Sequence, residues 1–270
     1  RLIGKHDRIR TAPIVFSSCE KVIDPTLEDA EPILVVDAWL DNIPDKPQFI
    51  HLTMTQPYFD DSTPPGVSGA SVVVTDEFSS TFVFVDDGSN TGTYVWSPPP
   101  GKSIGSVGTA YTLAVTTNGE TFTATTTIKR TAIIDSITFK IKPAFQFPEG
   151  SYIAEFWSTD PKGPGDTYWI KAYKNNVFLN KPSEINIAYD AGFSAGGDFD
   201  NATFIPPIRE AINPVDKDPN NQNKNLPPYV AGDSIRVDIC SISLAAFDHL
   251  QQIVEQTNRR VVSQSCLPSL

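Results

Sequence analysis

The sequence predicts an all-β protein in two parts, an antiparallel β-sandwich and a second β-rich domain with one long loop and one C-terminal amphipathic helix. Two observations predict this fold class. Short apolar runs recur about every ten residues between turns rich in Gly, Pro, Asn and Asp, which is the spacing of strands in a sandwich. Apolar residues at helical spacing occur over residues 244–258, near the end of the chain.

Residues 33–130 contain the strands of the predicted sandwich. The clearest signal lies in residues 111–128, where apolar residues alternating with threonines flank the turn signal Asn118-Gly119. Asn and Gly tolerate the positive φ of a type I′ turn, so this segment is predicted to be a β-hairpin. The other strands are expected over residues 33–36, 49–52, 70–75, 81–85 and 93–96.

Residues 131–270 form the second part, after a boundary at Lys129-Arg130-Thr131. Prolines interrupt residues 191–232, so this segment is predicted to be a long loop, of a kind that is usually functional or disordered. The helix over 244–258 is expected to cover a face or an edge of a sheet. Strands are expected over residues 133–141, 152–156, 168–174, 177–179 and 235–242.

The charge balance excludes one class of partner. The chain of 270 residues has 21 Lys and Arg against 32 Asp and Glu, a net charge of −11. Binding a nucleic acid through its phosphates requires a basic face, so no nucleic-acid partner is expected. No apolar run reaches the ~18 residues that a membrane-spanning helix requires.

The N-terminal residues resemble a processing signal. Residues 1–18 are basic ahead of an acidic body, as in a signal-like leader. Ile14-Val15-Phe16-Ser17-Ser18-Cys19 resembles a loose lipobox with a short apolar stretch, so Cys19 is the predicted lipidation site. Residues 19–32 are predicted to be an acidic linker, which is either a surface-export signal or a solvated stretch of chain.

Four segments together resemble one bacterial family. They are Cys19-Glu20-Lys21-Val22-Ile23-Asp24, Leu34-Val35-Val36-Asp37-Ala38, Ile50-His51-Leu52-Thr53-Met54-Thr55 and Val67-Ser68-Gly69-Ala70-Ser71-Val72. In this order they resemble the Bacteroidetes-type lipoproteins known as domain of unknown function 4249. The resemblance implies an Ig-like first domain, a lipid anchor in the outer membrane, exposure at the cell surface and a SusC-like TonB-dependent transporter as partner. It supplies no catalytic residue.

The sequence contains no recognisable catalytic or metal-binding motif. His51 and His249 share no spacing with a nucleophile, and no HExxH, paired CxxC, P-loop or GxSxG motif occurs. No catalytic residue, metal site or cofactor is therefore predicted. A carboxylate-dependent glycoside hydrolase remains the less favoured alternative, because its two carboxylates meet in space rather than in sequence.

Aromatic residues in loops are the candidate ligand-binding residues. Such rings offer a large apolar contact at low entropic cost, which suits a glycan or peptide ligand. The alternative is that they pin the loops to the body of the protein. The candidates are Tyr58, Phe59, Phe199, Phe204 and Tyr229. The sequence thus favours a non-enzymatic binding or accessory module over a structural or adhesive β-module without a small ligand.

Two cysteines lie in the second part. Cys240 falls within an apolar strand pattern, which favours a buried free thiol over a disulfide with Cys266.

Overall fold

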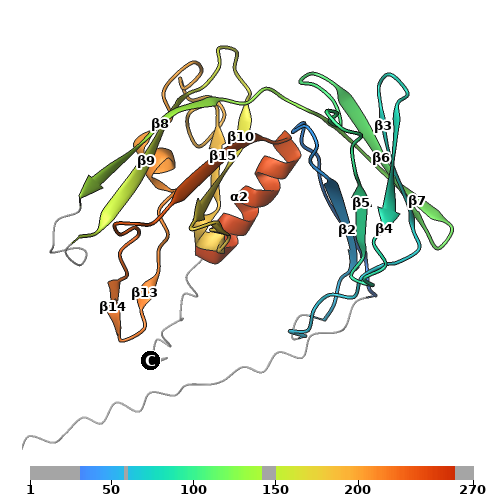
Figure 1. The fold of residues 1–270 in the computed structure, drawn as a ribbon, viewed down its shortest axis with the longest axis horizontal. Coiled ribbons are helices and arrows are strands. Elements are labelled where there is room, and N and C mark those ends of the chain that lie inside the picture. Colours follow the sequence, from blue (N-terminus) through green and yellow to red (C-terminus); the bar gives the residue numbers. More distant parts are fainter. Residues whose placement is uncertain (1–30, 58–59, 142–149, 259–270) are drawn as a thin grey trace, which may run out of the picture.

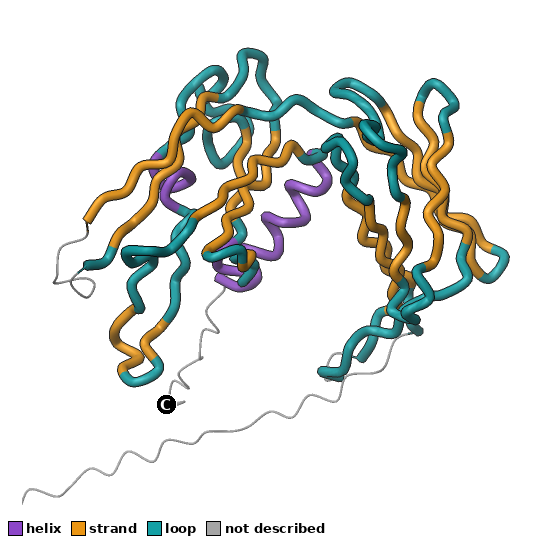
Figure 2. The backbone as a smooth tube through the Cα atoms, in the orientation of Figure 1, coloured by secondary structure: helices purple, strands orange, loops and turns teal. Residues whose placement is uncertain are grey.

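The computed structural model describes residues 31–57, 60–141 and 150–258. These residues are mostly β, in two parts joined by one connection between β7 and β8 (Figure 1). The first part lies at the right of the view and the second at the left. Helix α2 (Leu244–Asn258) lies between them, and strands dominate on both sides of it (Figure 2).

The first part is one antiparallel sheet of seven strands in the order β1-β2-β5-β4-β3-β6-β7. The sheet curls so that β2 and β5 lie across a shared core from β3 and β6. The strands are β1 (Leu34–Trp39), β2 (Gln48–Met54), β3 (Ser71–Asp76), β4 (Thr81–Asp86), β5 (Thr93–Trp96), β6 (Ala110–Thr117) and β7 (Glu120–Thr127).

Alternation along the strands produces this core. Ile50 and Leu52 of β2 are buried while Phe49, just before Ile50, is exposed, and β3 buries Val72 and Val74. Successive side chains of a strand point to opposite faces, so each strand contributes one row to the core and one to the outer face.

The two faces of the predicted sandwich are joined into one sheet. Val85 and Asp86 of β4 pair with Val95 and Tyr94 of β5, while the other edge of β4 pairs with β3. The sheet is therefore continuous through β4 and bends there. The sequence had instead predicted the two separate sheets of a sandwich. The expected strands of this part all occur, with ends that differ by three residues at most.

The predicted hairpin is confirmed. β6 and β7 pair along their whole lengths, and Asn118 and Gly119 at the turn have φ values of 51° and 81°, both positive as a type I′ turn requires. Asn175 and Asn176 have positive φ in the same way, at the turn that follows β10.

The second part packs a hairpin against a small sheet. The hairpin is β8 (Ile133–Ile141) and β9 (Tyr152–Thr159), and the sheet is centred on β10 (Thr167–Lys174). β15 (Ile235–Ser241) pairs with one edge of β10, and β12 (Asn186–Tyr189) and β11 (Val177–Phe178) pair with successive halves of the other edge. The second core lies between hairpin and sheet and includes Phe156, Tyr168, Ile170, Phe204 and Ile208.

Helix α2 has the bounds that the sequence predicts. The Ser243 hydroxyl accepts a hydrogen bond from the Ala246 amide at 3.2 Å, which caps the helix where it begins. Phe247 and Leu250 are buried against the outer face of the β10 sheet, around Trp169. The expected covering role is therefore confirmed. Within the described residues, no helix is both long and apolar enough to cross a membrane.

The segment 191–232 is more ordered than a long loop. It contains α1 (Pro206–Glu210) and a small hairpin of β13 (Lys217–Asp218) and β14 (Asn221–Asn225). Pro206 and Pro207 occupy the first turn of α1, where a missing N–H has no intrahelical partner to lose. A short 3-10 helix, η1 (Pro182–Glu184), and β12 were also not predicted.

Candidate functional site

Two of the predicted ligand-binding aromatics lie in the core. Phe204 is 0% and Tyr229 is 2% exposed. The Phe204 ring lies 5.4 Å from the Tyr168 ring, and the Tyr229 hydroxyl donates to the Ile212 carbonyl at 2.6 Å. The burial of these two rings agrees with the alternative stated for the loop aromatics, that they pin the loop to the body of the protein. They bind the segment 191–232 to the body, because burying such large rings stabilises the packed loop.

The other predicted residues fall into two groups. Phe199 is partly buried against the second core. Its ring occupies space that exists only because residues 192 and 197 are glycines. An added Cβ would lie 2.3 Å from the Phe199 ring at Gly192 and 2.4 Å from it at Gly197. Tyr58, Phe59 and the predicted lipidation site Cys19 lie outside the described residues.

A different set of aromatic residues gathers where the two parts meet. Trp39 at the end of β1 lies 5.1 Å from Trp169 of β10, measured between ring centroids. Trp169 lies 6.1 Å from Phe178 of β11, and Phe178 lies 5.1 Å from Tyr173 of β10. We call these four residues the aromatic strip.

The strand period explains the strip. Tyr168, Ile170 and Ala172 of β10 point into the second core, so the residues between them point outward. Tyr173 lies opposite Phe178 on one side and Arg236 on the other. The outer face of the sheet therefore carries one row of rings, which packs against α2 at Trp169, and Trp39 reaches this row from the first part.

Two cations lie on the rings of the strip. The Lys171 ammonium is 4.0 Å from the Trp169 ring centroid and 5.4 Å from that of Trp39. The Arg236 guanidinium is 3.8 Å from the Tyr173 centroid. The negative face of an aromatic ring attracts a cation at these distances. Among the described residues, no ion pair engages Lys171, while Arg236 contacts Asp238 at 3.4 Å.

The strip is a shallow surface. Trp39 is 41% exposed, and the other three rings and Lys171 are partly buried. At the Phe178 end, an open groove of about 410 Å³ continues the surface between Lys174 and Lys181. The Lys181 ammonium in this groove bridges Glu184 and Asp216. An extended ligand could thus contact the strip and the groove together.

Cys240 lies beside the strip, opposite Trp169 in the register of β15 and β10. It carries a free, partly buried thiol, and burial raises its pKa. Cys266 lies outside the described residues.

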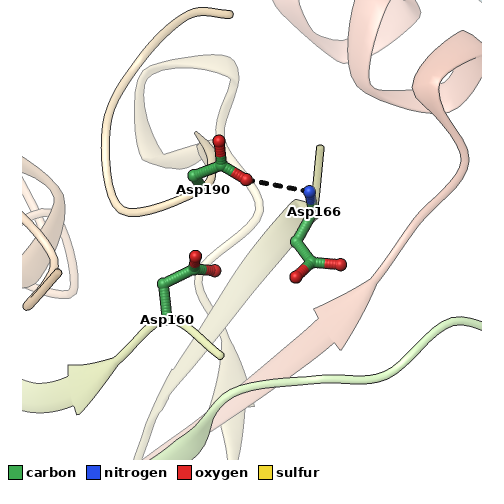
Figure 3. A group of neighbouring side chains, drawn as sticks. All are labelled: Asp160, Asp166 and Asp190. Carbon is green, nitrogen blue, oxygen red and sulfur yellow. Dashed lines mark hydrogen bonds between the residues drawn. The ribbon is translucent and has the colours of Figure 1, made fainter. Parts of the chain in front are cut away.

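Three buried aspartates form a second cluster at one end of the β10 sheet (Figure 3). Asp160 follows β9, Asp166 precedes β10 and Asp190 follows β12. One carboxylate oxygen of each lies within 4.8 Å of the others. No sequence motif indicated this cluster, although an aspartate at the end of each of three strands was a signal that could have done so.

Each aspartate already has protein partners. Asp166 accepts from Arg130 Nε at 2.8 Å, and Asp160 accepts from the Tyr168 hydroxyl at 2.6 Å. Asp190 accepts from the backbone amides of Gly165 and Asp166 at 2.8 and 2.9 Å. Burial, reinforced by the charges of Asp190 and Asp166, raises the pKa of Asp160.

The aspartate cluster fastens the turn between β9 and β10. Arg130 also donates to the backbone carbonyls of Pro161, Lys162 and Gly163, all in that turn. Carboxylate oxygens suit a hard cation such as Ca²⁺. These carboxylates are buried and accept hydrogen bonds from groups of the protein itself. The geometry therefore indicates a structural role, which is to hold the turn between β9 and β10 in place.

Comparison with protein families gives one continuous match across both parts of the chain. A family described as Domain of unknown function (DUF4249) matches residues 20–270. The chain belongs to the DUF4249 family. The match covers both parts of this DUF4249 protein, and with them the aromatic strip and the aspartate cluster. No curated protein matches the chain.

Proposed function

We propose that this DUF4249 protein is a non-enzymatic binding module that holds its ligand on the aromatic strip. The observation that carries the proposal is the gathering of four partly exposed rings and two cations where the two parts meet. Buried rings would contribute to stability alone. Rings on an outer face keep apolar surface in water, and contact with a ligand removes that surface from water.

The framework of the strip supports binding. Trp169 and Tyr173 lie on β10, which pairs with strands along both edges. The rings are therefore held before the ligand arrives, which lowers the entropic cost of binding.

The placement of titratable groups supports a non-enzymatic role. His51 on β2 contacts the Thr93 hydroxyl at 3.1 Å, and His249 lies on α2 in the other part. The aspartate cluster is buried and engaged by the chain, whereas a glycoside hydrolase needs two carboxylates that reach the sugar.

We also propose the location and partner. Lipidation at Cys19 would anchor the protein in the outer membrane at the cell surface, beside a SusC-like TonB-dependent transporter. The lipobox-like motif, the acidic residues after it and the family resemblance support this proposal. An Ig-like relationship of the first part belongs to the same proposal and is supported by the two limbs of its curled sheet around one core.

Ligand binding is tested with a glycan and peptide panel, followed by titration calorimetry on the best ligand. Trp39→Ala should weaken binding at least about tenfold, because an exposed tryptophan that anchors a ligand is worth ~2 kcal/mol or more. Phe122→Ala is the matched control, since Phe122 also lies on an edge strand and is 42% exposed. A ligand whose affinity is insensitive to Trp39→Ala would place its site elsewhere, and no binding across the panel would favour an adhesive β-module.

Anchoring is tested by fractionating cells that express the full-length precursor. Cys19→Ser should move the protein from the membrane to the soluble fraction. A Cys19→Ser protein that stays in the membrane would contradict the lipid anchor. Co-purification of the wild-type protein from mild detergent should recover a TonB-dependent transporter.

A further inference from the structure

We infer that the ligand of the aromatic strip is an acidic oligosaccharide, a chain of sugar rings that carry carboxylate groups. The inference rests on the proposed function, and it adds the chemical class of the ligand. It follows from three features of the strip, namely its charge, its length and the occupied edges of its central strand, β10.

The charge of the strip is opposite to that of the whole chain. The chain has a net charge of −11, but Lys171 and Arg236 place two positive charges on the rings. Asp238 lies opposite Lys171 in the strand register and contacts Arg236. At the rings, two positive charges face one negative charge, while the lysines of the groove beside Phe178 are paired with acidic residues. Lys171 makes no ion pair among the described residues. An anionic group on a ligand would supply the counter-charge.

The length of the strip fits a chain of rings. Trp169 and Tyr173 are four residues apart on β10, so their Cα atoms are about 13 Å apart along the strand. Trp39 extends the surface at one end, and the open groove beside Phe178 extends it at the other. Compact small molecules are usually bound in enclosed pockets, whereas this surface is long and open.

Sugar rings match the chemistry of the surface. One face of a pyranose presents C–H groups, which pack against the negative face of an aromatic ring. A carboxylate on the same sugar would reach the Lys171 ammonium, which lies over the Trp169 and Trp39 rings. Because Lys171 covers one face of Trp169, the sugar would stack on the exposed Trp39 ring while its carboxylate pairs with the Lys171 ammonium.

The pairing of β10 disfavours a peptide that would add to this central strand, although β1 and β15 each pair along one edge only. An extended peptide binds most simply by adding a strand to a free sheet edge. β10 has none, because β15 pairs with one edge and β12 and β11 pair with the other.

Titration calorimetry of the full chain separates these features. The probes are oligogalacturonate and its methyl-esterified counterpart, which have the same sugar backbone with and without charge. Oligogalacturonate should bind at least about tenfold more tightly than the ester, and the difference should shrink as salt is raised. The Lys171→Gln/Arg236→Gln protein should lose this preference. Lys162→Gln/Lys217→Gln, two exposed lysines outside the strip, is the control for net charge.

The outcomes distinguish the inference from the proposed function. Equal affinity for the two probes, abolished by Trp39→Ala, would overturn the acidic ligand and leave the binding strip in place. A preference for the acid that persists in Lys171→Gln/Arg236→Gln would also overturn the inference. Binding that ignores Trp39→Ala would overturn the proposed function itself. Failure to bind either probe, by a protein with wild-type circular dichroism and Tm, would overturn the acidic-oligosaccharide assignment.

Discussion

The rings of Trp39 and Trp169 come from different parts of the protein, yet their centroids lie 5.1 Å apart with the ring planes inclined at 54°. The Lys171 ammonium contacts both rings, so one cation and two indoles join the parts. The strip is complete only while the parts keep this relative position. Ligand binding and the orientation of the two parts are therefore linked.

The Trp39–Trp169 contact should be measurable as a coupling energy. A double-mutant cycle with Trp39→Ala and Trp169→Ala, followed by urea unfolding, should give a coupling of about 1 kcal/mol, as for other aromatic pairs. Trp39→Ala combined with Phe122→Ala should be additive, because no contact joins those two residues. A coupling energy near zero for the tryptophan pair would show that the Trp39–Trp169 contact does not hold the two parts together.

Gly92 should be intolerant of a side chain. It has a φ of 75°, and a Cβ there would lie 1.9 Å from the Leu52 carbonyl oxygen. Gly92→Ala should destabilise the first part by more than about 3 kcal/mol, since both backbone strain and a clash with the backbone of β2 oppose it.

Gly88 provides the matched control for Gly92. It has the same φ of 75° but open space around the added Cβ. Gly88→Ala should cost only the strain of the left-handed conformation, about 1–2 kcal/mol. Equal losses in urea unfolding for the two variants would show that the clash at Gly92 has no effect.

Glu155 should be a strong contributor to the stability of the second part. It is 1% exposed, with Arg209 Nη2 2.6 Å from Oε1 and Lys140 Nζ 2.6 Å from Oε2. Glu155→Gln should cost about 3 kcal/mol, because it leaves the Arg209 charge without its buried partner. Lys140→Gln should cost clearly less than Glu155→Gln, because Lys140 is largely exposed and Arg209 still pairs with the carboxylate.

The Glu155 contribution should depend on pH. Burial acts to raise its pKa, but hydrogen bonds from Lys140 and Arg209 outweigh burial and hold the pKa below its usual value. A lowered pKa in the fold stabilises the protein above the ordinary carboxyl value and loses this effect in acid. The stability difference between wild type and Glu155→Gln should therefore shrink from about pH 5 toward about pH 3. A difference that stays constant over this range would contradict the assignment.

Asp160 should show the opposite pH dependence. Its pKa is raised by burial, so its ionised form is disfavoured in the fold. Relative to Asp160→Asn, which keeps an acceptor for the Tyr168 hydroxyl, wild type should be most stable below about pH 4. This advantage should fall by about 1.4 kcal/mol per pH unit as the pH rises from there to the raised pKa, and should level off above it. Urea unfolding at several pH values measures it, and parallel curves for the two proteins would exclude the raised pKa.

Local signals predicted most of the secondary structure. Asn118-Gly119 indicated its hairpin because the positive φ of a type I′ turn is a property of those two residues. Helix α2 was indicated by apolar spacing alone, and its bounds agree with the structure. The sequence did not predict β12 and α1, because each contains too few residues for apolar spacing to show a period.

The candidate site could not be predicted in the same way. Phe204 and Tyr229 lie among prolines and polar residues that are typical of an exposed loop, yet the loop folds back and buries both rings. Trp39 and Trp169 each lie on an ordinary strand pattern, and nothing local to either residue indicates the other.

The sequence by itself determined where the strands and the long helix lie, which residues share a face of each strand, and which family the chain resembles. These properties depend on residues close together in the chain, where backbone preference and the period of side chains act directly. Only the tertiary structure decided what covers each face, and so which aromatic rings are buried in the core and which meet at the junction. Covering is a contact between distant segments, and the residues of one segment do not specify which other segment will pack against it.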